Sequence, residues 1–258
     1  MVAIIGDVHG CIKTLKYLLE RLFKHYNLET IVFAGDLIDR GADSKKVIEL
    51  IRNLKRHINV ICCLGNHEDM MIDFLLNERR YDKKLWLDNN GLATLKSFLG
   101  NRLYKKFKNR SLKPDKTVKP FGDYLDFFLS LSEYHIIELE SKKLFISHAG
   151  VEFFNLDIDE QYKELPDNLR KIKHPFIWSR NTDYEENIYN DYLIIHGHTP
   201  IKSLGLTNKF DYPYINSDSN GDIISINIDT GCIYGFALTA VIFNEKGEFD
   251  FEITNYRN

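Results

Sequence analysis

Candidate metal ligands recur in three short glycine-containing segments near the start of the chain. The segments cover residues 6–10 (GDVHG), 35–41 (GDLIDRG) and 65–68 (GNHE). Each contains Asp, His or Asn, which are side chains that bind hard and borderline divalent metals. His148 and His198 follow apolar runs later in the chain. A lone Asp or His after such a run means little, but five such positions in series predict a centre for two metal ions.

Strands and helices must bring these segments together. Apolar runs typical of buried strands directly precede the three segments, at residues 2–5, 31–34 and 60–64. Apolar residues at helical spacing occupy 13–23 and 44–55, and Ser44 is a candidate N-cap of the second helix. This order predicts a βαβαβ unit with parallel strands and right-handed crossovers. Because such strands end at one edge of the sheet, the ligands should meet there.

The middle of the chain differs in character from both halves. Between about residues 69 and 132, apolar residues recur at helical intervals, with breaks at 89–91 and Gly100, which predicts a helical insert. Residues 102–119 contain eight Lys or Arg and a single acid. We interpret this segment as a solvated surface, and a rim that attracts anionic substrates is the alternative.

The second half is mostly extended. Strands are expected at 134–139, 143–147, 191–195, 222–228, 235–243 and 249–254, the last two joined as a hairpin. Residues 216–221 are expected to form a polar turn. The sequence has no repeat or interdomain linker, so we predict a single α/β domain over residues 1–258.

Composition excludes several classes of protein. A net charge of −3 gives no support for a nucleic-acid or membrane partner. No apolar stretch approaches the ~20 residues that span a bilayer, and the N-terminal residues read as the first strand rather than a signal peptide. The four cysteines lack metal or disulfide spacing and are expected to be reduced. These features favour a cytoplasmic enzyme.

The candidate ligands divide naturally between two metals. Asp7 and His9 alternate along one loop, so both can face one metal, and Asp36 can bridge the two. The second metal can then be completed by Asn66, His148 and His198. Such a mixed oxygen and nitrogen set suits Mn²⁺, Fe or Zn²⁺ better than a thiolate site would. We expect two divalent ions, with Mn²⁺ as the first choice and Fe, Zn²⁺ or Ni²⁺ as alternatives.

Other polar residues in the motifs could carry out chemistry beside the metals. His67, paired with Asp39, could act as a general acid. Arg40 and Arg180 could bind phosphate oxygens. This set predicts phosphoryl transfer to water, in which a hydroxide shared by two metals attacks in line and His67 protonates the leaving alkoxide.

Three further polar residues have less definite roles. Glu68 is interpreted as structural, an acid in the first turn of the following helix. Asp229 either supports the site from behind the ligands or closes a turn. His196 lies in an apolar strand and is expected to be a core histidine.

Taken together, the motifs resemble those of calcineurin-like metallophosphoesterases. Their pattern GDxHG, GDxxDRG, GNHE, HxG and GHTP is present in order, the last two at 148–150 and 197–200, and residues 228–232 resemble a C-terminal signature of bacterial members. The similar branch contains Ser/Thr protein phosphatases, lambda-type phosphatases and symmetrical diadenosine tetraphosphate hydrolases. Pro200 stands where other branches have a second histidine, which fits a branch in which His9 serves the first metal.

The resemblance implies a fold and the same roles for the motif residues. It implies a central β-sandwich of mixed sheets flanked by helices, in place of a plain parallel sheet. The leading hypothesis is hydrolysis of phosphate monoesters, on a phosphorylated protein, a peptide or a small ester. The alternative is symmetrical hydrolysis of dinucleoside polyphosphates, which would need an adenine pocket formed by the insert and the C-terminal loops. A binding module without turnover is disfavoured, because Asp36, Asn66 and His67 are all present.

Overall fold

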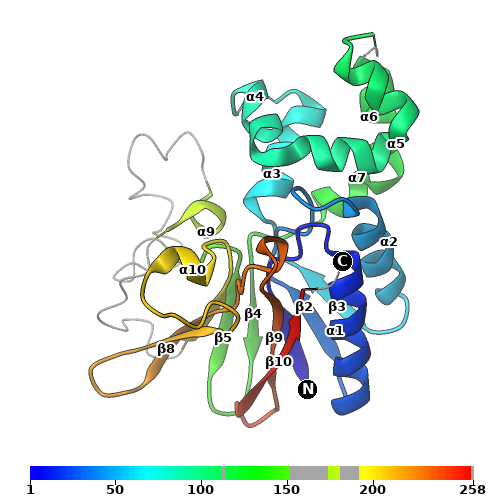
Figure 1. Cartoon of the computed structure of the whole chain (residues 1–258). Coiled ribbons are helices and arrows are strands. Elements are labelled where there is room, and N and C mark those ends of the chain that lie inside the picture. Colours follow the sequence, from blue (N-terminus) through cyan, green and yellow to red (C-terminus); the bar gives the residue numbers. More distant parts are fainter. Residues whose placement is uncertain (79, 112–113, 152–173, 181–191, 257–258) are drawn as a thin grey trace.

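Two mixed five-stranded sheets pack face to face, as expected from the resemblance (Figure 1). The computed structural model describes residues 1–256 except 79, 112–113, 152–173 and 181–191. The first sheet, in the order β10-β9-β1-β2-β3, consists of β1 (Val2–Ile5), β2 (Thr30–Phe33), β3 (Asn59–Cys62), β9 (Ala237–Phe243) and β10 (Phe249–Asn255). The second, in the order β4-β5-β6-β8-β7, consists of β4 (Tyr134–Glu138), β5 (Lys143–Ser147), β6 (Tyr192–His196), β7 (Tyr214–Ser217) and β8 (Ile223–Asn227).

The N-terminal βαβαβ unit is confirmed. Strand β2 pairs in parallel with β1 and β3, and helices α1 (Ile12–His25) and α2 (Ser44–Leu54) form the crossovers. Strand β9 runs antiparallel to β1 and forms the expected hairpin with β10. In the second sheet, β6 lies parallel to both β5 and β8. The parallel strands of both sheets therefore present their carboxyl ends to loops that can meet.

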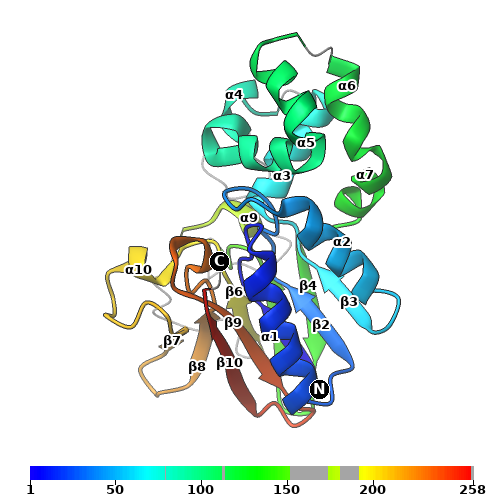
Figure 2. The same ribbon diagram turned by 45° about the vertical axis from the view of Figure 1, so that its right-hand side comes forward.

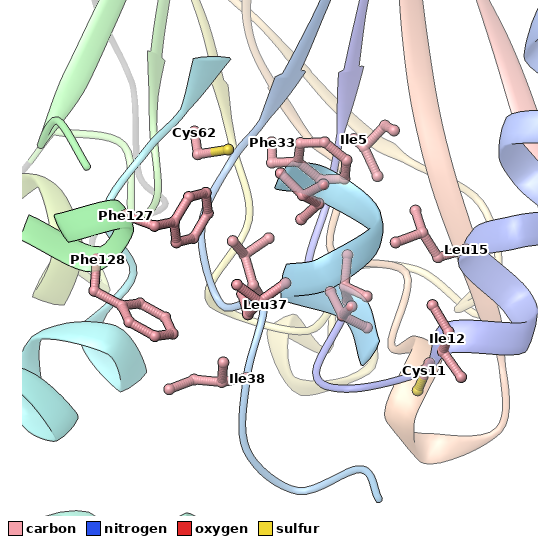
Figure 3. Close-up of a cluster of buried hydrophobic side chains, with 14 of the residues drawn as sticks. Ile5, Cys11, Ile12, Leu15, Phe33, Leu37, Ile38, Cys62, Phe127 and Phe128 are labelled. Carbon is pink, nitrogen blue, oxygen red and sulfur yellow. The ribbon is translucent and has the colours of Figure 1, made fainter. Parts of the chain in front are cut away.

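Alternation along β1 shows why the sequence forms two layers of core. Val2 and Ile4 belong to the cluster between the two sheets, whereas Ala3 and Ile5 face the helices. The helix-facing cluster continues into the loop that follows β2, where Leu37 and Ile38 pack near Phe33, Phe127 and Phe128 (Figure 3). Burying Leu37 and Ile38 fixes the loop that carries Asp36 and Asp39, because well-packed apolar side chains have few alternative positions.

The predicted N-cap role of Ser44 is wrong. Helix α2 begins at Ser44, but its N-cap is Asp43. The Ser44 hydroxyl instead accepts a hydrogen bond from the backbone N–H of Asp39 at 3.2 Å and lies 2.9 Å from the Thr94 hydroxyl. Ser44 therefore holds the loop after β2 and leaves the helix end uncapped by its side chain.

The helical insert is present and stands beyond the carboxyl ends of β1–β3 (Figure 2). It consists of α3 (Asn66–Leu76), α4 (Lys83–Trp86), a π-helical turn (Leu87–Gly91), α5 (Leu92–Lys108), α6 (Pro114–Val118), a 3₁₀ turn (Lys119–Phe121) and α7 (Gly122–Leu129). Both predicted breaks occur: Asn90 has a φ of 68° and Gly100 a φ of 69°. In the basic segment, Leu112 and Lys113 lie outside the described residues.

The second half departs from expectation mainly in its polar parts. Strand β7 extends into the expected polar turn, and the sequence did not indicate α9 (Pro175–Trp178), α10 (Ile201–Leu204) or the 3₁₀ turn Cys232–Tyr234. Strand β9 begins at Ala237, because Gly235 adopts a φ of 86° after that turn. Asp191, the expected start of β6, lies outside the described residues. Among the described helices, none is both long and apolar enough to cross a bilayer.

Candidate metal centre

All six predicted metal ligands converge at the carboxyl ends of parallel strands from both sheets. Asp7 and His9 follow β1, Asp36 follows β2, and Asn66 begins the helix after β3. His148 and His198 follow β5 and β6 in the second sheet. Each of these side chains is buried. A set of buried carboxylate, amide and imidazole groups is costly unless its members are paired or bind a cation.

Two groups of potential ligand atoms share Asp36. In the first group, His9 Nε2 lies 3.3 Å from Asp36 Oδ2 and 3.9 Å from Asp7 Oδ2. In the second group, His148 Nε2 lies 3.2 Å from Asp36 Oδ1, and His198 Nδ1 lies 3.1 Å from His148 Nε2. The two Asp36 oxygens thus face different groups, which is the arrangement of a bridging carboxylate.

The spacing of the second group fits a divalent ion. Asn66 Oδ1 lies 3.1 Å from His148 Nε2 and 3.2 Å from His198 Nδ1. Ligand atoms held at about 2.1 Å around one ion in octahedral or tetrahedral geometry stand roughly 3.0–3.4 Å apart. The ring nitrogen of His148 on the far side faces the Ala34 carbonyl at 3.0 Å, so in the neutral imidazole the nitrogen within the group carries the lone pair that a metal would bind.

The pKa shifts of Asp7 and His198 show what burial costs their charged forms. Burial raises the pKa of Asp7 well above its ordinary value, and the carboxylates of Asp229 and Asp36 raise it further. Burial lowers the pKa of His198 well below its ordinary value, which favours the neutral imidazole that binds metals. The side chains present therefore fit a centre of two divalent metals.

The backbone at these ligands adopts conformations that are rare elsewhere. His9, Asp36 and His198 have φ values of 43°, 49° and 69°, and Asp39 and Arg40 lie at 69° and 62°. Left-handed backbone costs about 1–3 kcal/mol per non-glycine residue and collects at functional sites. His9 Nδ1 bonds to the Ile38 carbonyl at 2.8 Å, which ties two of these turns together.

His67 points one ring nitrogen into the centre and the other away from it. Its Nδ1 lies 2.7 Å from Asp39 Oδ2, and its Nε2 lies 3.8 Å from Asp36 Oδ2. Burial disfavours the charged imidazole, but Asp36 and Asp39 outweigh it and raise the pKa of His67. The predicted pair of His67 and Asp39 is therefore formed, although His67 also lies within ligand distance of His9 and Asp36.

Glu68 has a larger structural role than its helix position indicated. Its Oε1 accepts the backbone N–H groups of Leu37 and Ile38, at 2.9 and 3.1 Å. Its Oε2 accepts those of Asp36 and Gly65, at 3.0 and 3.1 Å. Burial raises the pKa of Glu68 to about 7. One buried carboxylate thus fixes the loop that carries the bridging ligand.

The two candidate phosphate-binding arginines differ in placement. The guanidinium of Arg40 contacts His9 Nε2 and lies with its Cζ 5.9 Å from the ring centroid of Tyr234. Arg180 is exposed, lies 3.5 Å from the Thr199 hydroxyl, and helps to lower the pKa of His198. Arg40 is thus at the metal centre, and Arg180 is at its rim.

The two remaining predicted residues, Asp229 and His196, are both buried. Asp229 is buried, and its Oδ1 accepts the backbone N–H of Gly231 at 3.1 Å, so it closes a turn while it also raises the pKa of Asp7. His196 is a buried residue whose Nδ1 lies 3.2 Å from the Gly197 carbonyl. The sequence did not indicate that Trp86 and Thr94 of the insert reach Asp39, at 2.8 and 2.6 Å.

A mixed β-sandwich with two candidate ligand groups joined by one carboxylate is the arrangement expected of a dinuclear metallohydrolase. A family model gives the particular class: the chain belongs to the calcineurin-like phosphoesterase family, whose model matches residues 1–227. As a member, it is a dinuclear metal-dependent phosphoesterase.

Several known proteins are similar to the chain over most of its length. A bis(5′-nucleosyl)-tetraphosphatase PrpE [asymmetrical] of Oceanobacillus iheyensis is 28% identical over 94% of this chain and 88% of its own. The protein of that name from Halalkalibacterium halodurans is 25% identical, over 94% and 89%. A crystal structure whose description proposes a diadenosine tetraphosphatase has a TM-score of 0.56 and 19% identity, covering 100% of this chain and 94% of that one. A Ser/Thr phosphatase structure from Saccharomyces cerevisiae has a TM-score of 0.54 and 15% identity, over 100% and 80%.

Proposed function

We propose that the chain hydrolyses dinucleoside polyphosphates, the alternative among the two hypotheses from the sequence. The observation that carries this proposal is the name shared by its relatives, bis(5′-nucleosyl)-tetraphosphatase, over 94% of the chain. Their name also specifies asymmetrical cleavage, whereas the sequence hypothesis was symmetrical. We therefore propose that a dinucleoside tetraphosphate is cleaved into a nucleoside triphosphate and a nucleoside monophosphate.

The metal ligands take the roles that the motifs suggested. We assign Asp7, His9 and Asp36 to one ion, and the second ion to Asp36, Asn66, His148 and His198. When bound, the ions supply a nucleophile from water and neutralise charge on the phosphate. Mn²⁺ is the proposed metal, because the donors mix carboxylate, amide and imidazole.

The other residues act on the substrate and the leaving group. Arg40, beside the first ligand group, binds non-bridging phosphate oxygens through its guanidinium. His67 holds a proton at Nε2, and Asp39 fixes the opposite ring nitrogen. His67 then gives this proton to the departing oxygen. Arg180 at the rim is a second phosphate contact.

The exposed ring of Tyr234 supports a nucleotide substrate. The side chain is 54% exposed and lies beside Arg40, the proposed phosphate ligand. An aromatic surface next to a phosphate site can stack a nucleobase, a contact worth about 1–3 kcal/mol. We expect Tyr234→Ala to raise KM for diadenosine tetraphosphate about tenfold and to leave KM for p-nitrophenyl phosphate unchanged. Tyr212→Ala, at another exposed tyrosine, is the matched control.

The deciding experiment compares two substrates and analyses the products. With Mn²⁺ added, kcat/KM is measured on diadenosine tetraphosphate and on a phosphothreonine peptide. We expect a preference of about a hundredfold for the dinucleotide, equivalent to roughly 2.7 kcal/mol of transition-state discrimination. ATP and AMP should appear as products by anion-exchange chromatography. A preference for the peptide would favour the phosphate monoesterase hypothesis instead. ADP as the only product would establish symmetrical cleavage.

The acid role of His67 has its own test. His67→Asn should retain both metals and lose rate mainly on substrates with poor leaving groups, because a good leaving group departs without a proton. Metal content and kcat on phenyl phosphate and p-nitrophenyl phosphate provide the measurement. An equal loss of kcat on the two substrates would contradict the assignment.

A further inference from the structure

We propose that the helical insert positions the general acid, through Trp86 and Thr94, which hold the Asp39 carboxylate that orients His67. This inference rests on the proposed function, in which His67 protonates the leaving group. Trp86 and Thr94 are positioning residues, because they contact neither the ligand groups nor the phosphate contacts described above.

Three donors converge on the Asp39 carboxylate. Oδ2 lies 2.7 Å from His67 Nδ1 and accepts the indole N–H of Trp86 at 2.8 Å. Oδ1 accepts the hydroxyl of Thr94 at 2.6 Å, and the same hydroxyl accepts the backbone N–H of Asp39 at 2.9 Å. Asp39 has no exposed surface, so water cannot replace either partner. Both carboxylate oxygens therefore accept a hydrogen bond from the insert.

The insert in turn fixes the indole. Trp86 is 1% exposed, and its ring lies 4.9 Å from that of Phe74 between centroids. Gly91 packs so closely that a Cβ there would lie 2.5–2.7 Å from indole atoms, including Nε1. Gly91 ends the turn that breaks the insert at residues 89–91. That break allows the backbone to lie against the indole.

If Trp86 were only a core residue, its replacement would destabilise the fold but would not slow substrates with poor leaving groups more than those with good ones. The hydrogen bond to Asp39 predicts a selective effect, because an Asp39 carboxylate that can rotate no longer aligns His67 with the leaving oxygen. A displacement of about 1 Å in such a group costs up to 100-fold in rate. Only reactions that require protonation of the leaving group should be slowed, and metal binding should not change.

The test uses variants that remove one donor or move it. Trp86→Phe keeps an aromatic ring and removes the N–H, and Thr94→Val keeps the shape and removes the hydroxyl. Gly91→Ala displaces the indole without a backbone penalty, since Gly91 has a helical φ of −58°. The control is Trp178→Phe, which removes an indole N–H that contacts Tyr81 at 3.1 Å.

The readout is kcat and KM on a poor and a good leaving group. Phenyl phosphate releases a phenol with a pKa near that of tyrosine, about 10, and p-nitrophenyl phosphate releases a better leaving group. We expect Trp86→Phe, Thr94→Val and Gly91→Ala each to lower kcat on phenyl phosphate about tenfold and on p-nitrophenyl phosphate less than about threefold. KM and metal content should stay unchanged. Trp178→Phe should change both substrates by the same factor.

A double-mutant cycle separates this inference from the proposed function. In a His67→Asn background, Trp86→Phe should cause no further loss on phenyl phosphate, because both changes remove the same step. A further tenfold loss there would overturn the inference and leave the acid role intact. Equal losses of kcat on both substrates in His67→Asn alone would overturn the acid role and the inference with it. Should Trp86→Phe fail to fold, Thr94→Val and Gly91→Ala give the same comparison.

Discussion

Replacing Gly197 with alanine tests the placement of Asp7 in the metal centre. Gly197 is buried between β6 and His198, and its φ lies outside the left-handed region. The backbone therefore accepts alanine, and any effect must come from the added methyl group. A Cβ at this position would lie 2.1 Å from Asp7 Oδ1 and 3.7 Å from the Cβ of Asp229.

The magnitude follows from that distance. Ordinary van der Waals contact begins at 3.4 Å, so the methyl group and Asp7 Oδ1 must separate by about 1.3 Å. The methyl group would also be in ordinary van der Waals contact with the Cβ of Asp229. Asp7 also accepts the backbone N–H of His198 at 3.3 Å, so either movement displaces a proposed ligand. A displacement of about 1 Å in a catalytic centre costs roughly 100-fold, or about 2.7 kcal/mol.

The assay measures kcat/KM on p-nitrophenyl phosphate while Mn²⁺ is titrated, with metal content determined on the dialysed protein. We expect Gly197→Ala to lose about 100-fold in kcat/KM at limiting Mn²⁺ and to contain less than two metals per chain. Gly122→Ala is the matched control. Gly122 begins α7 with a φ of −52°, and a Cβ there would meet no atom within 4 Å. Full metal content and activity within threefold in Gly197→Ala would refute the reasoning.

Three further perturbations follow from other parts of the structure. Glu68→Ala leaves four buried N–H groups without their acceptor, which costs about 1–3 kcal/mol each. The midpoint of thermal unfolding should therefore fall by more than about 5 °C. The control, Glu49→Ala at an exposed residue, should shift it by less than about 2 °C. Dialysis against a chelator should abolish activity and lower the thermal midpoint, and Mn²⁺ should restore both, because the buried carboxylates of the centre lose their counter-ions. Burial lowers the pKa of His174, but its contact with Glu133 at 2.7 Å raises the pKa overall. This pair should therefore stabilise the fold fully below about pH 6.5, the unfolded value, and the stabilisation should be lost as pH rises through the higher folded pKa. His174→Gln should remove this component from the pH dependence of the midpoint, and an unchanged profile would count against the pair.

The positions of the candidate metal ligands were readable from the sequence because their information is local. Each ligand lies within a few residues of the strand end that positions it, as Asp7 follows β1 and Asp36 follows β2. An apolar run followed by Asp, His or Asn therefore indicates both the strand and the ligand. The five loops converge because parallel strands of a sheet end at the same edge. In the second sheet, β6 is parallel to β5 and β8, and this arrangement brings His148 and His198 to the same place.

Residues that support the ligands were harder to find because their partners are distant in sequence. The first-turn acid Glu68 reads as a favourable charge at a helix start, but its carboxylate reaches the loop 30–32 residues earlier. Trp86 fits the apolar period of the insert, and periodicity does not distinguish an indole N–H from a hydrocarbon. Ser44 resembled a cap, although a tertiary contact with Asp39 takes its hydroxyl.

Strand β7 was missed for a different physical reason. Its last residues, Asn216 and Ser217, are polar and favour turns by propensity. Pairing with β8 overrides that propensity, and the register shifts between these two residues. An edge strand of this kind is defined by its neighbour more than by its own residues.

The two sets of residues at the centre come from different parts of the fold, which makes their functions separable. The proposed metal ligands lie at the strand ends of the sandwich or, for Asn66, at the first residue of the helix that follows β3. The groups that hold Asp39 come from α4 and α5 of the insert. Substitutions at Trp86 and Thr94 should therefore change the ratio of rates on poor and good leaving groups without changing metal content. Leaving-group preference can then vary with the insert while the two-metal chemistry of the sandwich is retained.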